Sequence, residues 1–332
     1  MSVFDMLHRP LEDIRISLTD RCNFRCTYCM PRSEYGPDYK FLPRDELLSF
    51  EELEFLVSQL LPFGLKKVRL TGGEPFLRKD AHHLVGLLRA LSIDLDIAIT
   101  TNGVLLKQAL PKFVEHGLSR VTVSLDALDN DVFQTMADSN LFSPTDVLEG
   151  IQLCKLLDVP VKVNTVVRKG VNEHQIVPLL KTMKSMNVEI RFIEFMDVGQ
   201  TNQWNIDEVV TGQEIREIIS SEYGLLQSIE NHTSAVARRW KLADGYTFGC
   251  IESVSNPFCS TCGRIRVSAN GRLYTCLFSE QFHDVKEVIR YHPEDVQDFF
   301  SNIWLKRKDR YSEQRTNDTD ALKKPEMSFI GG

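Results

Sequence analysis

The chain has 332 residues, of which 42% are hydrophobic and 26% are charged, and its formal net charge is −7. These values are ordinary for a globular protein, and the negative charge argues against a general binder of nucleic acid or of a membrane surface. No apolar run is long enough to span a membrane, and the N-terminus lacks the features of a secretion signal or a transit peptide. We therefore expect a cytoplasmic protein whose eight cysteines bind metal rather than form disulfides.

The first group of cysteines directly follows a strand expected over residues 11–18. Cys22, Cys26 and Cys29 are spaced so that one compact turn can direct three thiolates to one centre. Structural zinc sites and iron–sulfur clusters usually have four protein ligands, and no fourth cysteine or histidine lies nearby in the sequence. A cluster held by three thiolates leaves one iron open, as catalytic metal sites do. The alternative is a zinc knuckle whose fourth ligand comes from elsewhere in the fold.

Strands and helices then alternate as far as about residue 196. A capping box at Ser49 begins the first helix, a Ser143-Pro144 pair begins a later one, and Gly117 follows the end of a third. Further strands are expected over residues 66–70, 95–100, 120–126, 159–167 and 188–196, and further helices over residues 80–91 and about 176–186. This order implies parallel strands with right-handed crossovers.

The fold class expected is therefore α/β, either an incomplete (βα)6 TIM-like barrel or a doubly wound sheet. In both architectures, functional groups gather at the C-terminal ends of the strands. The alternation ends near residue 204, so we expect a partial barrel over residues 1–203 and a C-terminal extension over residues 204–332. Within the extension, residues 211–221 and 294–308 are expected to be helical, and residues 225–248 to form antiparallel strands.

A second group of three cysteines lies in the extension. Cys259 and Cys262 form a tight pair, and Cys276 follows fourteen positions after Cys262. Two such groups in one chain favour paired iron–sulfur clusters. The alternative is a zinc ribbon completed by Cys250. Cys154 lies among leucines on an expected helix and is interpreted as a small buried hydrophobic residue.

Charged residues inside the strands are the second anomaly, because parallel strands covered on both faces should be nearly continuous apolar runs. Period-two alternation directs these cations to one face, where an unpaired charge would be costly. The pattern predicts a polyanionic ligand such as a nucleoside triphosphate. The alternative is that the charges are solvated at a rim or paired with Glu189 and Glu194. The candidate cations are Arg15, Lys67, Arg69, Lys162, Arg191, Arg264 and Arg266.

Two other features carry less weight. Gly72 and Gly73 end a strand and provide backbone that a ligand can approach closely, although such turns are common. The eight histidines show no metal-binding spacing, so none is assigned a role. His82 and His83 are expected on a helix surface.

The first cysteine motif and the Gly72-Gly73-Glu74-Pro75 turn resemble those of the radical S-adenosylmethionine superfamily. The second cysteine motif, the Arg264-Ile265-Arg266 segment and the terminal Gly331-Gly332 pair resemble, more narrowly, the GTP 3′,8-cyclases of molybdenum-cofactor biosynthesis. The likeness covers nearly the whole chain. It implies two four-iron, four-sulfur clusters, and it implies conversion of GTP to (8S)-3′,8-cyclo-7,8-dihydroguanosine 5′-triphosphate by means of a 5′-deoxyadenosyl radical.

The resemblance also implies roles for individual residues. Cys22, Cys26 and Cys29 would hold the cluster that binds S-adenosylmethionine, and Cys259, Cys262 and Cys276 a second cluster that contacts guanine. The Gly331-Gly332 tail would reach into the active site. Contacts to S-adenosylmethionine are implied for Tyr28, Gly73, Ser124 and Met196, in a pocket shaped by Thr71, Gly72 and Glu74. Contacts to GTP are implied for Arg15, Lys67, Arg69, Thr100, Lys162, Arg191, Arg264 and Arg266.

The partners implied are GTP as substrate, an electron donor and the next enzyme of the pathway, with neither nucleic acid nor membrane. A homodimer is an expectation that rests on the resemblance alone. Two rival interpretations remain: a radical enzyme with an auxiliary cluster that acts on a peptide, and a zinc-binding module without enzymatic activity. Whether Cys250 contributes a fourth thiolate to the second cluster stays open at this stage.

Overall fold

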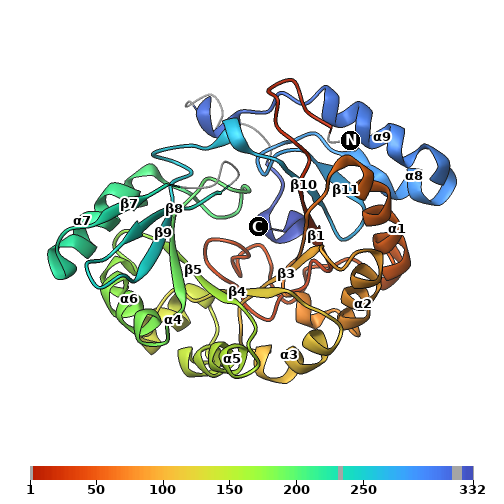
Figure 1. Cartoon of the computed structure of the whole chain (residues 1–332). Coiled ribbons are helices and arrows are strands. Elements are labelled where there is room, and N and C mark those ends of the chain that lie inside the picture. Colours follow the sequence, from red (N-terminus) through yellow and green to blue (C-terminus); the bar gives the residue numbers. More distant parts are fainter. Residues whose placement is uncertain (1–2, 231–234, 316–323, 332) are drawn as a thin grey trace.

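The computed structural model describes residues 3–230, 235–315 and 324–331. Within these ranges, one curved sheet of twelve strands runs in the order β12-β11-β10-β1-β2-β3-β4-β5-β6-β9-β8-β7. Figure 1 shows the sheet as an open arc with helices along its outer side, while the C-terminal helix α10 (Met327–Ile330) lies inside the arc. The inner side of this arc is where the site is built.

Six neighbouring parallel strands form the centre of the sheet and confirm the predicted alternation. They are β1 (Asp13–Ser17), β2 (Lys67–Thr71), β3 (Asp96–Thr101), β4 (Arg120–Ser124), β5 (Val161–Val167) and β6 (Glu189–Glu194). The helices between them are α1 (Phe50–Leu60), α2 (Ala81–Leu91), α3 (Leu106–Glu115), α4 (Asn130–Ala137), α5 (Pro144–Leu156) and α6 (Ile176–Ser185). Only α4 was not among the predicted helices.

The local signals for helix ends act as expected. Ser49 accepts a hydrogen bond from the Glu52 amide and the Glu52 side chain bonds back to Ser49, so the capping box that begins α1 is present. Gly64, with a φ of 95°, ends the short turn after α1. Pro144 occupies the first position of α5, where its missing amide hydrogen costs nothing.

The residues after 203 extend the same sheet at both of its edges. At one edge, β9 (Thr247–Ile251) pairs in parallel with β6, and β8 (Arg238–Lys241) and β7 (Gln227–Ile229) continue in antiparallel fashion. At the other edge, β10 (Arg264–Val267) pairs in parallel with β1, followed by antiparallel β11 (Arg272–Tyr274) and β12 (His283–Asp284). The sequence indicated antiparallel strands over residues 225–248 but not the return of β10 to β1.

The apolar core lies between the sheet and the outer helices, which include α7 (Gly212–Tyr223), α8 (Val285–Tyr291) and α9 (Val296–Leu305). On β1, Ile14 and Ile16 are fully buried, and Arg15 between them faces the inner side of the arc. This alternation directs aliphatic side chains toward the helices and directs polar side chains such as that of Arg15 toward the inner side of the arc. No helix in the described ranges is both long enough and apolar enough to cross a bilayer.

Candidate active site

A cavity of about 200 Å³ lies on the inner side of the arc. Strands from β1 to β6, together with β9 and β10, contribute side chains to it, so both halves of the chain build one site. Six of the eight residues predicted to contact GTP line it, namely Arg15, Arg69, Thr100, Arg191, Arg264 and Arg266. Cys259, Cys262, Cys276 and Met196 line the same cavity.

Strand register places three arginines side by side. Arg15 on β1 is the register partner of Arg266 on β10 and of Arg69 on β2. Arg69 donates hydrogen bonds to the hydroxyl oxygens of Thr100, at 2.9 Å, and of Thr122, at 3.1 Å. The Nε atoms of Arg15 and Arg69 are buried without a hydrogen-bond partner. Buried donors without partners are costly, so this row is suited to an incoming acceptor.

The electrostatics of the arginine row also favour an anion. Burial lowers the pKa of Arg69 to about 9, with a further contribution from the charge of Arg15. Burial and the neighbouring charges of Arg15 and Arg264 lower the pKa of Arg266. Within the described ranges, Arg15, Arg69, Arg264 and Arg266 form no salt bridge with a carboxylate. The charge of Asp13 acts on Arg15 and Arg69 without forming a salt bridge, so these four cations favour a negative ligand that can pair with them directly.

The other predicted cations are partly neutralised. Lys67 Nζ lies 2.6 Å from Asp13 Oδ2, and both residues border a separate hollow where the strands begin. Glu189 pairs with Lys162 at 3.1 Å and with Arg191 at 2.8 Å. Lys67 and Lys162 do not line the main cavity, so the structure does not gather all seven cations there. Pairing with Glu189 was the alternative considered from sequence, and it holds for Lys162 and Arg191.

The second group of cysteines lies beside the arginines. The guanidinium of Arg264 lies 3.2 Å from Cys262 Sγ and that of Arg307 lies 3.5 Å from it. Burial alone would raise the pKa of the Cys262 thiol, but these two cations outweigh burial and lower the pKa to about 6. Burial raises the pKa of Cys276 to about 12. Cys262 therefore supports a thiolate without help, whereas Cys276 requires a metal to stabilise the same form.

Cys250 is fully buried on β9 and packs in the apolar core. Its neighbour Ile251 lines the cavity, so alternation along β9 directs the Cys250 thiol to the opposite face. The structure thus separates Cys250 from Cys259, Cys262 and Cys276. Cys154 is likewise fully buried, as predicted.

The first group of cysteines lies in the loop that follows β1, and all three are partly buried. Arg25 organises this loop by donating hydrogen bonds to the carbonyl oxygens of Cys22 and Tyr35, at 2.9 and 2.8 Å. Burial raises the pKa of Cys22 to about 12, and burial together with the charges of Cys22 and Cys29 raises that of Cys26 well above the ordinary thiol value. Free thiolates are therefore disfavoured in this loop, and a bound metal centre would be needed to stabilise them.

The sulfur positions bear on the choice between a cluster and a single zinc ion. Two thiolates on one tetrahedral zinc ion, each about 2.3 Å from it, lie about 3.8 Å apart. Among the described residues, neither cysteine group brings three Sγ atoms within 4.8 Å of one another. Both groups consist of thiolates alone, the ligands that iron–sulfur clusters require. These cysteine-only donor sets are therefore suited to iron–sulfur clusters.

The Gly72-Gly73 turn has a clear packing role. A Cβ at Gly73 would lie 2.2 Å from the Arg21 carbonyl oxygen, and a Cβ at Gly72 would lie 2.5 Å from the Thr19 carbonyl oxygen. The Gly73 amide donates to Thr19 at 2.7 Å, and the Glu74 amide donates to Arg21 at 2.8 Å. The glycines thus allow the β2 turn to bind the segment that leads into the cysteine loop.

Glu74 is fully buried behind this turn and organises it. Its carboxylate accepts hydrogen bonds from the Thr101 hydroxyl, the Asn102 amide and the Phe76 amide, at 2.9, 2.9 and 3.2 Å. The Asn102 side chain in turn lies 3.9 Å from Cys22 Sγ. Glu74 therefore connects the ends of β2 and β3 to the cysteine loop.

Tyr28 is oriented by Asp126, which was not among the predicted site residues. Its hydroxyl donates to Asp126 Oδ2 at 2.6 Å, and the Val166 amide donates to the other oxygen of Asp126 at 2.8 Å. Ser124 ends β4 two residues earlier, on the same edge of the sheet. Thr122 and Asn164 also line the cavity. Period two along β4 and β5 would have pointed to both, because Thr122 alternates with apolar residues and Asn164 shares a face with Lys162.

The C-terminal segment borders the cavity, and its Met327 is one of the lining residues. Arg266 donates a hydrogen bond to the Gly331 carbonyl oxygen, and a Cβ at Gly331 would lie 2.3 Å from Thr71 Cγ2. Asp197, just after β6, accepts hydrogen bonds at 2.8 Å from Tyr311, Arg315 and Lys324. Gly332, the other predicted tail residue, lies outside the described residues.

Comparison with known proteins shows which families this chain resembles. Residues 16–183 match the family model of the radical SAM superfamily, and residues 188–313 match the model Molybdenum Cofactor Synthesis C. The GTP 3′,8-cyclase of Staphylococcus carnosus is 44% identical over 99% of both chains. That of Staphylococcus haemolyticus is 44% identical over 99% of this chain and 98% of its own.

This chain belongs to the GTP 3′,8-cyclase family.

Solved structures add a likeness of fold to this family assignment. SuiB of Streptococcus suis bound to S-adenosylmethionine aligns with a TM-score of 0.64 at 13% identity, over 95% of this chain and 73% of its own. The structure titled native anSMEcpe with bound AdoMet aligns with a TM-score of 0.55 at 16% identity, over 94% of this chain and 88% of its own. This chain thus shares the fold of these two solved structures.

Proposed function

We propose that this protein is a radical S-adenosylmethionine enzyme that converts GTP to (8S)-3′,8-cyclo-7,8-dihydroguanosine 5′-triphosphate, an early step of molybdopterin cofactor biosynthesis. One observation carries the proposal: Arg15, Arg69, Arg264 and Arg266 line the same cavity as the second cysteine group, without a carboxylate partner in the described ranges. A triphosphate supplies the missing negative charge, and a purine beside the cysteines supplies a ligand for an open metal position.

Cys22, Cys26 and Cys29 would hold one four-iron, four-sulfur cluster and leave one iron for the amino and carboxylate groups of S-adenosylmethionine. When bound, the cluster and S-adenosylmethionine together supply the radical chemistry that removes a hydrogen atom from the 3′ carbon of the ribose. The protein's own contribution is to position this cofactor. Tyr28, held by Asp126, and Gly73, held by Thr19, would contact it. Further contacts are proposed for Ser124 and Met196, and Thr71, Gly72 and Glu74 would shape the pocket around it.

The second cysteine group would hold a second four-iron, four-sulfur cluster with an open iron for guanine. The location of Cys250 in the apolar core, and not among the residues that line the cavity, supports a cluster with three thiolates rather than four. The arginine row would bind the triphosphate by charge-assisted hydrogen bonds, and Thr100 would orient Arg69. Lys67, Lys162 and Arg191 would join these contacts only by exchanging their carboxylate partners for phosphate.

The architecture proposed is an incomplete (βα)6 TIM-like barrel over residues 1–203, with an extension over residues 204–332 that carries the second cluster and the Gly-Gly tail. We further expect a cytoplasmic enzyme that receives electrons from a separate donor and delivers its product to the next enzyme. A homodimer remains a prediction. Action on a peptide is less well supported, because a peptide substrate gives no reason for a row of four arginines without carboxylates.

Metal analysis of the anaerobically purified protein tests the proposal. We expect about eight iron atoms and eight sulfides per chain, from two clusters of four. The C259S variant should keep about four of each, and the C250S variant should keep all eight. A colourless protein that contains zinc and no iron would contradict the proposal. Loss of iron in C250S as large as in C259S would contradict the assignment of the second cluster's ligands.

A further inference from the structure

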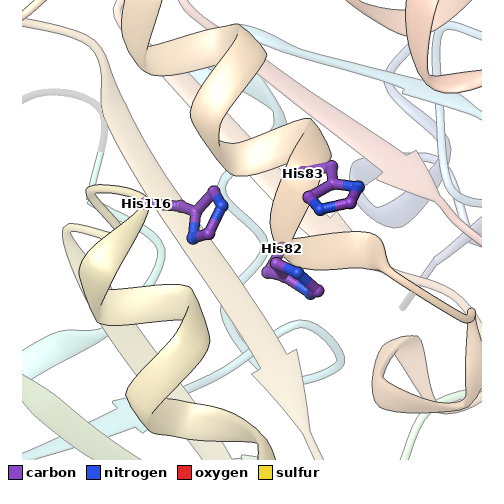
Figure 2. Close-up of side chains that lie close together, drawn as sticks. All are labelled: His82, His83 and His116. Carbon is purple, nitrogen blue, oxygen red and sulfur yellow. The ribbon is translucent and has the colours of Figure 1, made fainter.

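Three histidines gather on the outer surface of the sheet's helical layer, away from the cavity. His82 and His83 lie at the beginning of α2, and His116 directly follows the end of α3 (Figure 2). One ring nitrogen from each histidine lies within 4.8 Å of those of the other two. None of the three lines the cavity or belongs to either cysteine group. The proposed cyclase activity therefore leaves this cluster without a role.

The ring geometry suits a common ligand better than stacking. The ring centroids lie 4.3 Å apart for His82 and His83, 4.8 Å apart for His82 and His116, and 5.8 Å apart for His83 and His116. The ring planes are inclined to one another by 45° to 76°. Inclined rings can direct one nitrogen each toward a common point, which parallel stacked rings cannot.

The hydrogen bond of His116 provides a second, independent indication. Its Nδ1 lies 2.7 Å from the Lys112 carbonyl oxygen. A carbonyl oxygen can only accept, so Nδ1 is the donor of this hydrogen bond and Nε2 is the ring nitrogen left for a metal. Histidines that bind metals commonly donate their other ring nitrogen to a backbone carbonyl in this way, which fixes the tautomer and the ring orientation.

The packing between the two helices leaves space for this arrangement. A Cβ on Gly86 would lie 3.1 Å from His116 Cδ2, so glycine at this position of α2 allows the His116 ring to lie close against the helix. Gly86 is one turn beyond His82 and therefore on the same face.

Two charged residues of opposite sign lie near the three histidines. They are Lys112 on α3 and Asp80, which precedes α2. Because neutral imidazole is the ligand for borderline ions such as Zn²⁺, Ni²⁺, Co²⁺ and Cu²⁺, three such nitrogens match this class rather than Mg²⁺ or Ca²⁺. We propose that His82, His83 and His116 form a surface site for a divalent transition-metal ion, with Zn²⁺ as the ion tested. The bound ion connects α2 to α3 and keeps one coordination position for water.

The test uses the full chain with both cysteine groups occupied by iron–sulfur clusters, so that added zinc does not report on free thiols. Zinc binding is measured by calorimetric titration, and the zinc neighbours by X-ray absorption at the zinc edge. We expect one equivalent of zinc with nitrogen and oxygen neighbours at about 2.0–2.1 Å. Failure to bind zinc at micromolar concentration would overturn the proposal, as would sulfur neighbours at about 2.3 Å.

Variants then locate the site. H116A and H82A should each weaken zinc binding by at least about tenfold, because each removes a ligand. H174A removes an exposed histidine elsewhere and should bind zinc as the unaltered protein does. H292A tests the other surface group that could hold an ion, formed by His292, Glu294 and Asp295. Zinc binding that is lost in H292A and kept in H116A would overturn the proposal.

Separate measurements test whether the H116A substitution disturbs folding. The iron content and the zinc-free unfolding temperature of H116A should equal those of the unaltered protein, since the ring is partly exposed and lies on the surface. Added zinc should raise the unfolding temperature of the unaltered protein but not that of H116A. An equal rise in both proteins would show that the ion binds elsewhere and would contradict the site.

Discussion

The side chain of Arg266 donates a hydrogen bond to the main-chain carbonyl oxygen of Gly331, 65 positions further along the chain. Through register, Arg266 is also the neighbour of Arg15 on β1. The C-terminal segment therefore contacts the arginine row directly, and the cation that we assign to GTP is the one that holds the tail. A glycine is required at position 331 because its φ is 71° and a Cβ would meet Thr71.

Deletion of Gly331 and Gly332 should impair turnover far more than folding. The two residues bury almost no side-chain surface, so we expect a small change in the free energy of unfolding and unchanged iron content. Turnover of GTP should fall by about tenfold or more. A G331A variant serves as the matched change, because it keeps the chain length but disturbs the contact with Thr71. Full turnover in both variants, or an unfolded truncated protein, would contradict this role.

Arg266→Ala should weaken GTP binding while leaving the clusters in place. Loss of a charge-assisted hydrogen bond costs about 1.5–3 kcal/mol, which corresponds to a roughly 10- to 150-fold rise in the dissociation constant. Calorimetric titration of GTP into the cluster-loaded protein measures it. Arg290→Ala is the matched control, because Arg290 pairs with Glu52 on the outer surface. Equal GTP affinity of the R266A and R290A variants would remove Arg266 from the site.

Asp197→Asn should loosen the C-terminal segment. Asp197 and Lys324 are both 4% exposed, and removing one charge from a buried pair costs about 3 kcal/mol. Faster proteolysis of the C-terminal segment and a lower free energy of unfolding are the readouts. Asp298→Asn, an exposed carboxylate on α9, should change neither.

The contribution of Asp197 to the free energy of unfolding should also depend on pH and should decrease in acid. Burial alone would raise the pKa of Asp197, but the hydrogen bond from Lys324 and the charge of Arg315 outweigh it and lower the pKa. The stabilisation is therefore present above the ordinary pKa of an aspartate and is lost as the pH falls through the lowered value. The difference in unfolding free energy between the unaltered protein and D197N should narrow in acid. A difference that widens in acid would contradict the ion-pair explanation.

Gly73→Ala should disrupt the turn beneath the cysteine loop. Its Cβ would lie 2.2 Å from the Arg21 carbonyl oxygen, and backbone cannot yield as a flexible side chain can. We expect a loss of about 1–3 kcal/mol in the unfolding free energy of the cluster-free protein. Iron retention should also fall by about half, because only the first cluster depends on this loop. Gly36→Ala, with its nearest neighbour at 3.5 Å, is the control, and an equally small effect in both variants would contradict the packing role.

Local patterns predicted the central parallel strands and the residues that alternate along them. Arg15 and Arg69 could be assigned to the inner face because apolar residues flank them in a period of two. The same reasoning did not reveal that Lys67 finds Asp13, although both residues begin neighbouring strands in register. Strand register decides which charged residues pair. The register of two strands that lie 54 positions apart cannot be deduced from the sequence of either strand alone.

Contacts between segments that lie far apart in the sequence could not be predicted from local sequence patterns. The pairing of β10 with β1 and the contact of Asp197 with Lys324 join segments that share no local pattern. His116 was missed for the same reason. Consecutive helical residues such as His82 and His83 point about 100° apart, so the cluster becomes visible only when α3 brings the third ring.

The most direct test of the cyclase proposal follows one hydrogen atom. The reduced, cluster-loaded protein is incubated with S-adenosylmethionine and GTP that carries deuterium at the ribose 3′ carbon, and the 5′-deoxyadenosine formed is analysed by mass spectrometry. We predict that GTP accelerates 5′-deoxyadenosine formation and that the product carries one deuterium. Formation that is no faster with GTP than without it, or product free of deuterium, would contradict the account.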